Sequence, residues 1–187
     1  MRGPLLSPRP SKDQYYLDIA REVSRRGTCL RRQYGAVIVK DDQIVSTGYA
    51  GAPRGVVNCV DLGRCLRDDM GVPAGQRYEL CRSVHAEMNA VIHASRAQTL
   101  DAVLYLTGME VADGQPTEHP EPCLLCRRVI INAGIREVVV QPRGQAIKRL
   151  DPTQWIAEEN QAAAQGLVAP LEAEDIKDRH GGGGGDS

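Results

Sequence analysis

The sequence predicts an α/β protein in which a central sheet carries helices on both faces. The first observation is a set of β-branched apolar runs of strand length, at residues 34–39, 101–107 and 135–140. The second is that segments with apolar residues at helical spacing stand between the later runs. Strands and helices that alternate along a chain build sheets covered on both sides.

The two ends of the chain differ in composition from its middle. Residues 1–11 contain three prolines and no apolar periodicity, so we expect a disordered arm. Residues 171–187 include five consecutive glycines and are expected to form a flexible tail. The remaining residues, 12–170, are enough for one domain with a core that needs no disulfides.

The first half of this domain predicts a helix followed by a β-hairpin. Ser11 or Asp13 can cap the helix, whose apolar residues recur at helical spacing. Residues 34–39 and 44–47 are joined by a polar turn, which is typical of a hairpin. Residues 48–55 then form a loop with three glycines, where the backbone can approach a ligand closely.

The second half predicts alternating helices and strands. In order, we expect a long connection at 58–76, a helix from about His85, a strand at 101–107, a polar loop at 108–121, a helix from about Cys123 that ends at 132–134, a strand at 135–140, a helix at 153–164 and a short edge strand at 167–169. Long connections are uncommon in small domains and often carry function.

Composition excludes several classes of protein. The chain has 23 basic and 24 acidic residues, one Trp and no Phe, which argues against a nucleic-acid surface. The basic cluster at 25–32 indicates either a solvated helix end or an RNA-binding stripe. No apolar run approaches the roughly 20 residues of a membrane span, and the N-terminus lacks the apolar centre of a secretory signal. We therefore expect a cytoplasmic protein whose six cysteines are thiols or metal ligands.

Two motifs carry the chemistry, His85-Ala86-Glu87 and Pro122-Cys123-Leu124-Leu125-Cys126. Each stands at the start of a predicted helix. Cys123 and Cys126 are three residues apart, so both thiols lie on one helix face, about 5–6 Å apart at Cβ. With His85 they make three donors, and a catalytic zinc site keeps its fourth position open. Glu87 remains free to move protons.

Each motif alone has a plainer interpretation. A His-x-Glu pair is common by chance, and a Cys-x-x-Cys pair also serves structural zinc, redox chemistry or simple burial. The redox interpretation is disfavoured because such a pair usually follows the first strand of its domain. Both motifs together, with a strand between them, match the pattern of zinc nucleobase deaminases.

The chain resembles the cytidine/deoxycytidylate deaminase superfamily, most closely its dCMP deaminase branch. The matching stretches are residues 28–39, 46–55, 79–90, 122–126 and 130–134. The resemblance implies a three-layer α/β/α sandwich around a five-stranded mixed sheet. It also implies assembly into homo-oligomers, often hexamers.

The same resemblance implies a zinc-dependent hydrolase that removes the exocyclic amine of a cytosine-type nucleotide such as dCMP and releases ammonia. His85, Cys123 and Cys126 would bind zinc, and Glu87 would protonate N3 and then the amino group. The Ala86 backbone N–H would hold the base carbonyl. Six further residues are expected to line the substrate site: Ala50, Gly51, Arg54, Ser83, Val84 and Pro122. Arg54 meets a phosphate or is an exposed loop arginine.

Two features depart from the branch. Its loop usually reads Gly-Tyr-Asn-Gly, and the Asn contacts the sugar hydroxyl, whereas Ala50 offers no hydrogen bond. Residues 108–121 add about a dozen positions before the Pro-Cys motif, either as a tolerated surface insertion or as a lid. Together they favour an alternative, a deaminase of a different amino-heterocycle in a biosynthetic pathway.

Four cysteines lie outside the motif: Cys29, Cys59, Cys65 and Cys81. They are expected to be buried free thiols or to close a second, structural zinc site of the kind some branch members carry. A competing hypothesis is a catalytically idle, nucleotide-sensing zinc module. Glu87 argues against that hypothesis, because a module that needs only zinc has no use for a free carboxylate.

Overall fold

A five-stranded sheet forms the centre of the molecule, in the order β2-β1-β3-β4-β5. The computed structural model describes residues 9–73 and 76–166 of the chain. The strands are β1 (Arg32–Lys40), β2 (Gln43–Tyr49), β3 (Val103–Glu110), β4 (Glu137–Val140) and β5 (Lys148–Leu150). Only β3 and β4 are parallel, and the other neighbours are antiparallel. The sheet is therefore mixed, as the resemblance implied.

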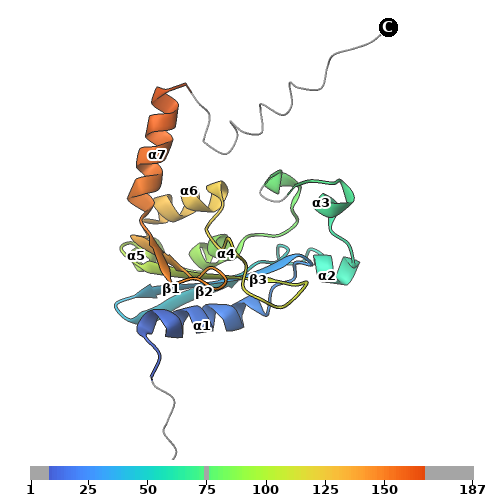
Figure 1. Ribbon diagram of the computed structural model, residues 1–187, viewed down its shortest axis with the longest axis horizontal. Helices are drawn as coiled ribbons and strands as arrows, with labels where there is room; N and C mark the ends of the chain where they lie inside the picture. Colours follow the sequence, from blue (N-terminus) through green and yellow to red (C-terminus); the bar gives the residue numbers. More distant parts are fainter. Residues whose placement is uncertain (1–8, 74–75, 167–187) are drawn as a thin grey trace, which may run out of the picture.

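Helices cover both faces of this sheet (Figure 1). On one face lies α1 (Lys12–Ser24), whose N-cap Ser11 accepts a hydrogen bond from Gln14 as predicted. The other face carries α4 (Ala86–Ile92), α6 (Leu124–Ala133) and α7 (Pro152–Ala164). The three-layer α/β/α sandwich is confirmed. Four short helices complete the described residues: α2 (Cys59–Leu62), α3 (Leu66–Asp69), η1 (Tyr78–Leu80) and α5 (Arg96–Thr99).

The core has two halves because both faces of the central strands are buried. Ala36 and Ile38 of β1 pack toward α4 and α6, while Val37 and Val39 pack toward α1. Such a strand reads as a continuous apolar run, which is why residues 36–39 show no alternation.

Helix α4 packs very closely on β2, and this contact places the start of the helix. A Cβ atom on Gly48 would lie 2.3 Å from both Ala86 O and Ala90 N. Ser46 Oγ donates a 2.8 Å hydrogen bond to Ala90 O, and Asn89 Nδ2 donates to Tyr49 O at 2.8 Å. Glycine thus allows backbone contact here, and polar side chains fix the register of the helix on the strand.

The sequence predicted a loop at residues 108–121. Residues 108–110 belong to β3, and residues 111–121 are a loop apart from one isolated bridge. Strand β3 continues to Glu110, and the chain returns beside it, with an isolated bridge between Met109 and Pro116. Thr117 N donates to Gly108 O at 2.9 Å, and Thr117 is buried. Hydrophobic patterns did not predict this short hairpin, because its turn is polar and exposed. Backbone hydrogen bonds to β3 therefore hold residues 115–117 of this loop beside the strand.

Other boundaries also differ. The strand expected from Asp101 begins at Val103, because Asp101 takes a positive φ of 61°. Strand β5 was missed since two of its three residues are basic and exposed at the sheet edge. The predicted edge strand at 167–169, the tail and most of the arm lie outside the described residues. No helix in the described ranges has the length and hydropathy of a membrane span.

Candidate metal centre

Two helix starts meet at the carboxyl ends of β2 and β3. His85 is the N-cap residue of α4, and Cys123 is the N-cap residue of α6. Cys126 lies in the first turn of α6 and is fully buried. We expected His85 inside the first helical turn, and the structure places it one position earlier. Its side chain points at the two thiols.

The three donor atoms fit one metal ion. His85 Nδ1 lies 3.4 Å from Cys123 Sγ and 3.3 Å from Cys126 Sγ. All three donors lie within 4.8 Å of one another, and no other such group occurs in residues 9–73 and 76–166. Zinc bonds of about 2.0 Å to nitrogen and about 2.3 Å to sulfur separate two tetrahedral donors by about 3.5 Å. The donor set and its spacing therefore suit zinc.

One of the two thiols, Cys123, is electrostatically prepared for a metal. A hydrogen bond from Cys126 lowers the pKa of the Cys123 thiol, and the neighbouring His85 adds to that effect. The same bond to Cys123 raises the pKa of Cys126. One thiolate is thus favoured even before binding, and thiolate is the form that coordinates zinc.

Glu87 lies beside the donors but outside their group. Its side chain is 4% exposed, on the first turn of α4, and it is close enough to Cys126 to raise the pKa of that thiol. Burial raises the pKa of its carboxyl group. A buried carboxyl that is not a metal ligand can take up and return protons.

A cavity of about 120 Å³ opens onto these residues. His85, Ala86, Glu87 and Cys123 form part of its wall. The other residues of the wall are Cys29, Arg31, Arg32, Tyr34, Ala50, Arg67, Tyr78, Cys81, Ser83 and Glu121. The space is concave, mixed in polarity and adjacent to the donors, as a small-molecule site would be.

Comparison with protein families adds an independent observation. The family model described as the cytidine and deoxycytidylate deaminase zinc-binding region matches residues 10–141. The chain belongs to this family. The match includes both helix starts, so the donor group of this deaminase-family chain lies within the region described as zinc-binding.

Individual relatives differ in length from this chain. A deoxycytidylate deaminase of Mycobacterium phage D29 is 37% identical over 135 residues, which are 70% of this chain and 94% of that protein. One from Schizosaccharomyces pombe is 34% identical over 142 residues, 74% of this chain and 40% of that protein. The chain therefore spans less than half of the yeast relative. A solved dCMP deaminase from cyanophage S-TIM5, in complex with dCMP and dUMP, is 24% identical to this chain. The TM-score is 0.49, and the match covers 72% of this chain and 83% of that one.

The predicted substrate residues have different places in this deaminase-family fold. Ala50, Ser83 and Ala86 line the cavity. Gly51 and Val84 exchange backbone hydrogen bonds of 3.2 and 2.8 Å and hold the loop after β2 against the residues before α4.

Pro122 and Arg54 do not line the cavity. Pro122 is buried directly before Cys123, so it shapes the entry into α6. Arg54 is exposed and absent from the cavity wall, which fits the interpretation as a loop arginine.

Sequence reasoning missed several residues of the cavity wall. Tyr34 donates a 3.3 Å hydrogen bond to His119 O in the 108–121 hairpin. The Tyr78 ring lies edge-on to the His85 ring, with centroids 5.0 Å apart. Arg67 comes from the aperiodic connection at 58–76, whose length was the only available signal of its importance.

Proposed function

We propose that this chain is a zinc-dependent hydrolase that removes the exocyclic amine from a cytosine-type nucleotide such as dCMP. One observation carries the proposal: His85, Cys123 and Cys126 fit one ion, while buried Glu87 lies outside that donor group. A structural zinc site is usually closed by four protein ligands, whereas three ligands leave a position for chemistry. Membership in the family and the names of its relatives support the same activity.

The chain's own residues supply the proton transfers. When bound, zinc supplies Lewis acidity that makes water a nucleophile near neutral pH. Glu87 accepts the proton of the attacking water, delivers one to ring N3 and returns another to the departing amine. The C4–N bond breaks, a C4=O bond forms and ammonia leaves. Ala86 N–H lies in the first turn of α4, where amides have no intrahelical partner, so it can hold the base carbonyl.

A second candidate is deamination of another amino-heterocycle. The observation in its favour is Ala50, which lines the cavity with a methyl group and is only 7% exposed. A site that offers no hydrogen bond at this point loses discrimination in favour of a sugar hydroxyl. The idle sensing module is less well supported, because a buried carboxyl is costly where no chemistry uses it.

Ammonia release from a panel of substrates tests the proposal. The panel contains dCMP, CMP, cytidine, cytosine, guanine and other amino-heterocycles, with zinc-loaded protein. We expect the highest kcat/KM for a cytosine nucleotide. Preference for another heterocycle would move the assignment to the second candidate, and no ammonia from any compound would favour the sensing module.

We also propose that the chain forms a homo-oligomer in the cytoplasm. Large apolar side chains are exposed along one segment around α2 and α3: Val56, Val57, Val60, Leu62, Leu66 and Met70. Contiguous exposed apolar surface is typical of interfaces. Thiol ligands persist in a reducing compartment, which supports the location. Light scattering after gel filtration measures the assembly, and a monomer at all concentrations would contradict it.

A second, structural zinc ion is the remaining proposal for the four other thiols. Burial raises the pKa of Cys59, and the neighbouring Cys29, Cys65 and Cys81 raise it further, so the four gather in one region. No three of these sulfurs lie within 4.8 Å of one another, so the cluster would have to contract to hold an ion. We expect C65S to lose one of two zinc ions per chain; a single zinc in the unmodified protein would reject the site.

A further inference from the structure

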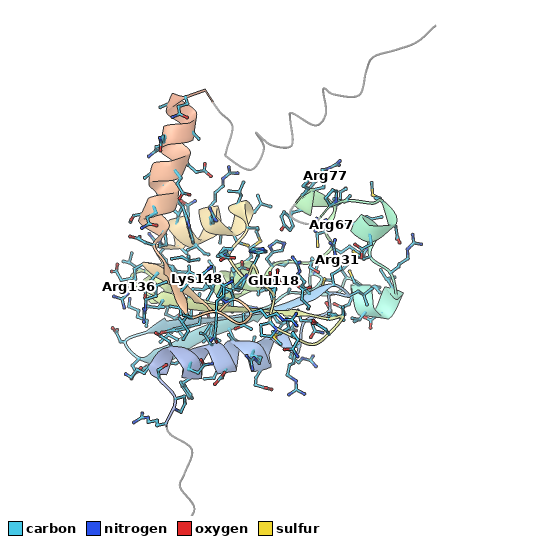
Figure 2. All side chains as sticks on the ribbon, in the orientation of Figure 1. Arg31, Arg67, Arg77, Glu118, Arg136 and Lys148 are labelled. Carbon is cyan, nitrogen blue, oxygen red and sulfur yellow. The ribbon has the colours of Figure 1, made fainter. Side chains whose placement is uncertain are left out.

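Arg67 is a buried cation in the wall of the catalytic cavity. Its side chain comes from α3 and is 7% exposed, and it shares the cavity with His85 and Glu87. Arginine is almost never buried to this degree unless a partner offsets its charge. Figure 2 shows Arg67 and Arg31 on the α3 side of the molecule. A carboxylate of the protein or an anionic ligand is therefore expected beside Arg67.

The protein holds this guanidinium in place without neutralising it. Its Nη2 donates to the carbonyl oxygens of Pro73, at 2.9 Å, and Gln76. Its plane lies over the Tyr78 ring, 4.9 Å from the centroid. Within residues 9–73 and 76–166, its Nε is buried without a hydrogen-bond partner. Across the part of the chain that the structure describes, no carboxylate forms an ion pair with Arg67.

The other charged groups of the cavity wall have partners. Arg31 pairs with Asp68 at 3.0 Å, and Arg32 pairs with Glu110 at 2.8 Å. Both are also more exposed, with 30% and 41% of the side chain accessible. The acidic Glu121 pairs with Lys148 at 3.5 Å. Arg31 Nη1 is also buried without a good hydrogen bond, but it lies 3.0 Å from the Asp68 carboxylate. Among the described residues, Arg67 is thus the cavity arginine without a carboxylate partner, and an unpaired buried donor is costly.

The position of Arg67 defines the shape of that ligand. The Tyr78 ring contacts both groups: its centroid lies 4.9 Å from the Arg67 guanidinium carbon and 5.0 Å from the centroid of the His85 ring. A molecule that contacts both the metal donors and Arg67 needs a reactive ring at the donors and an anion at Arg67. A nucleoside monophosphate has this form, and guanidinium groups are well suited to bind phosphate.

We propose that Arg67 binds the phosphate of the substrate and selects nucleotides over nucleosides. This inference rests on the proposed deaminase function and assigns the substrate class within it. Arg31 and Arg32 line the same cavity, but each is paired with an acidic side chain, so Arg67 is assigned this role.

Substrate pairs that differ only by the phosphate test this role. The assay measures kcat/KM for dCMP and for deoxycytidine with the zinc-loaded protein, R67Q, R67K and R64Q. Arg64 is a matched control, because it lies on the same connection but is exposed, paired with Asp69 and absent from the cavity wall. We expect R67Q to lower kcat/KM for dCMP about 10- to 100-fold, as for the loss of a charge-assisted hydrogen bond. The value for deoxycytidine should stay within about twofold, and R64Q should change neither.

A purely structural role of Arg67 gives a different result. R67Q would then lower kcat/KM for dCMP and for deoxycytidine by the same factor, and that outcome overturns the inference. R67K keeps the charge and should restore part of the dCMP preference. If R67Q does not fold, the affinities of the unmodified protein for dUMP and deoxyuridine decide instead.

Binding separates this inference from the proposed function. Calorimetry compares dUMP with deoxyuridine on the unmodified protein and on the Arg67 variants. If no substrate is deaminated, the proposed function fails, yet tighter binding of dUMP that R67Q or R67K weakens still supports the phosphate site. Equal affinity of the unmodified protein for dUMP and deoxyuridine would overturn the site whatever the activity.

Discussion

At the residue scale, local spacing predicted that three side chains converge, and tertiary folding placed their neighbours. His85 and Cys123 each precede a helix, so short motifs were enough to predict that their donors converge. Arg67 and Tyr78 reach the cavity from short helices in an aperiodic connection. No pattern in the sequence fixes how such a connection folds, because its position depends on contacts with the finished domain.

Ala50 gives a prediction about substrate choice at this scale. It lines the cavity with a methyl group, where the resemblance to the dCMP deaminase branch leads us to expect a hydrogen-bonding Asn. If the natural substrate is a cytosine nucleotide, A50N should raise kcat/KM for dCMP about fivefold to tenfold, the usual gain from one hydrogen bond. The gain should be smaller for cytosine, which has no sugar. A loss of dCMP activity in A50N would favour a different heterocycle as the natural substrate.

At the element scale, the contact of α4 with β2 positions His85. A Cβ on Gly48 would lie 2.3 Å from two backbone atoms of α4, neither of which can rotate away. We expect G48A to lower the free energy of unfolding by about 1–3 kcal/mol and to reduce zinc affinity, because the helix must shift. Urea denaturation and zinc titration measure the two effects.

The neighbouring T47A is the matched control for this contact, since Thr47 is exposed on the same strand. It should change stability by no more than about 0.5 kcal/mol. Equal stability of G48A and T47A would show that α4 is not held by this contact.

The start of α7 gives a prediction about pH. Asp151 Oδ1 accepts a 2.8 Å hydrogen bond from Thr153 N, and this bond lowers the pKa of the carboxyl group. A lowered pKa in the folded state means that the cap stabilises the helix above the unfolded value of about 3.9 and is lost as the pH falls through the folded value. D151N, which caps without titrating, should remove this acid dependence.

Amide hydrogen exchange in α7 at pH 6 and below pH 4 measures this dependence. Protection in the unmodified protein should fall at the lower pH after correction for intrinsic exchange, and protection in D151N should not. The same fall in both proteins would assign the acid sensitivity to another group.

At the scale of the whole molecule, the sequence predicted the layers and the mixed sheet but not the elements at its periphery. Buried strands such as β1 carry strong apolar runs, which make them recognisable. The edge strand β5 and the 108–121 hairpin are polar because one side of each faces water. Hydrophobic patterns cannot reveal such elements, since backbone pairing with a neighbour stabilises them.

Removal of zinc should destabilise the whole fold, because the donors join α4 and α6 across about 40 residues of chain. A strong chelator should lower the Tm by several degrees, and added Zn²⁺ should restore it. Added Mg²⁺ is the control and should have no effect, since it prefers oxygen donors. An unchanged Tm after complete removal of zinc would show that the donors do not hold a stabilising ion.

The most direct test of the central claim is to compare zinc content and dCMP turnover in E87Q and the unmodified protein. If His85, Cys123 and Cys126 bind the ion while Glu87 moves protons, E87Q keeps the same zinc per chain, and its kcat falls at least about 100-fold. Loss of the zinc in E87Q would make Glu87 a ligand, and undiminished turnover would remove it from the reaction; either result contradicts the account.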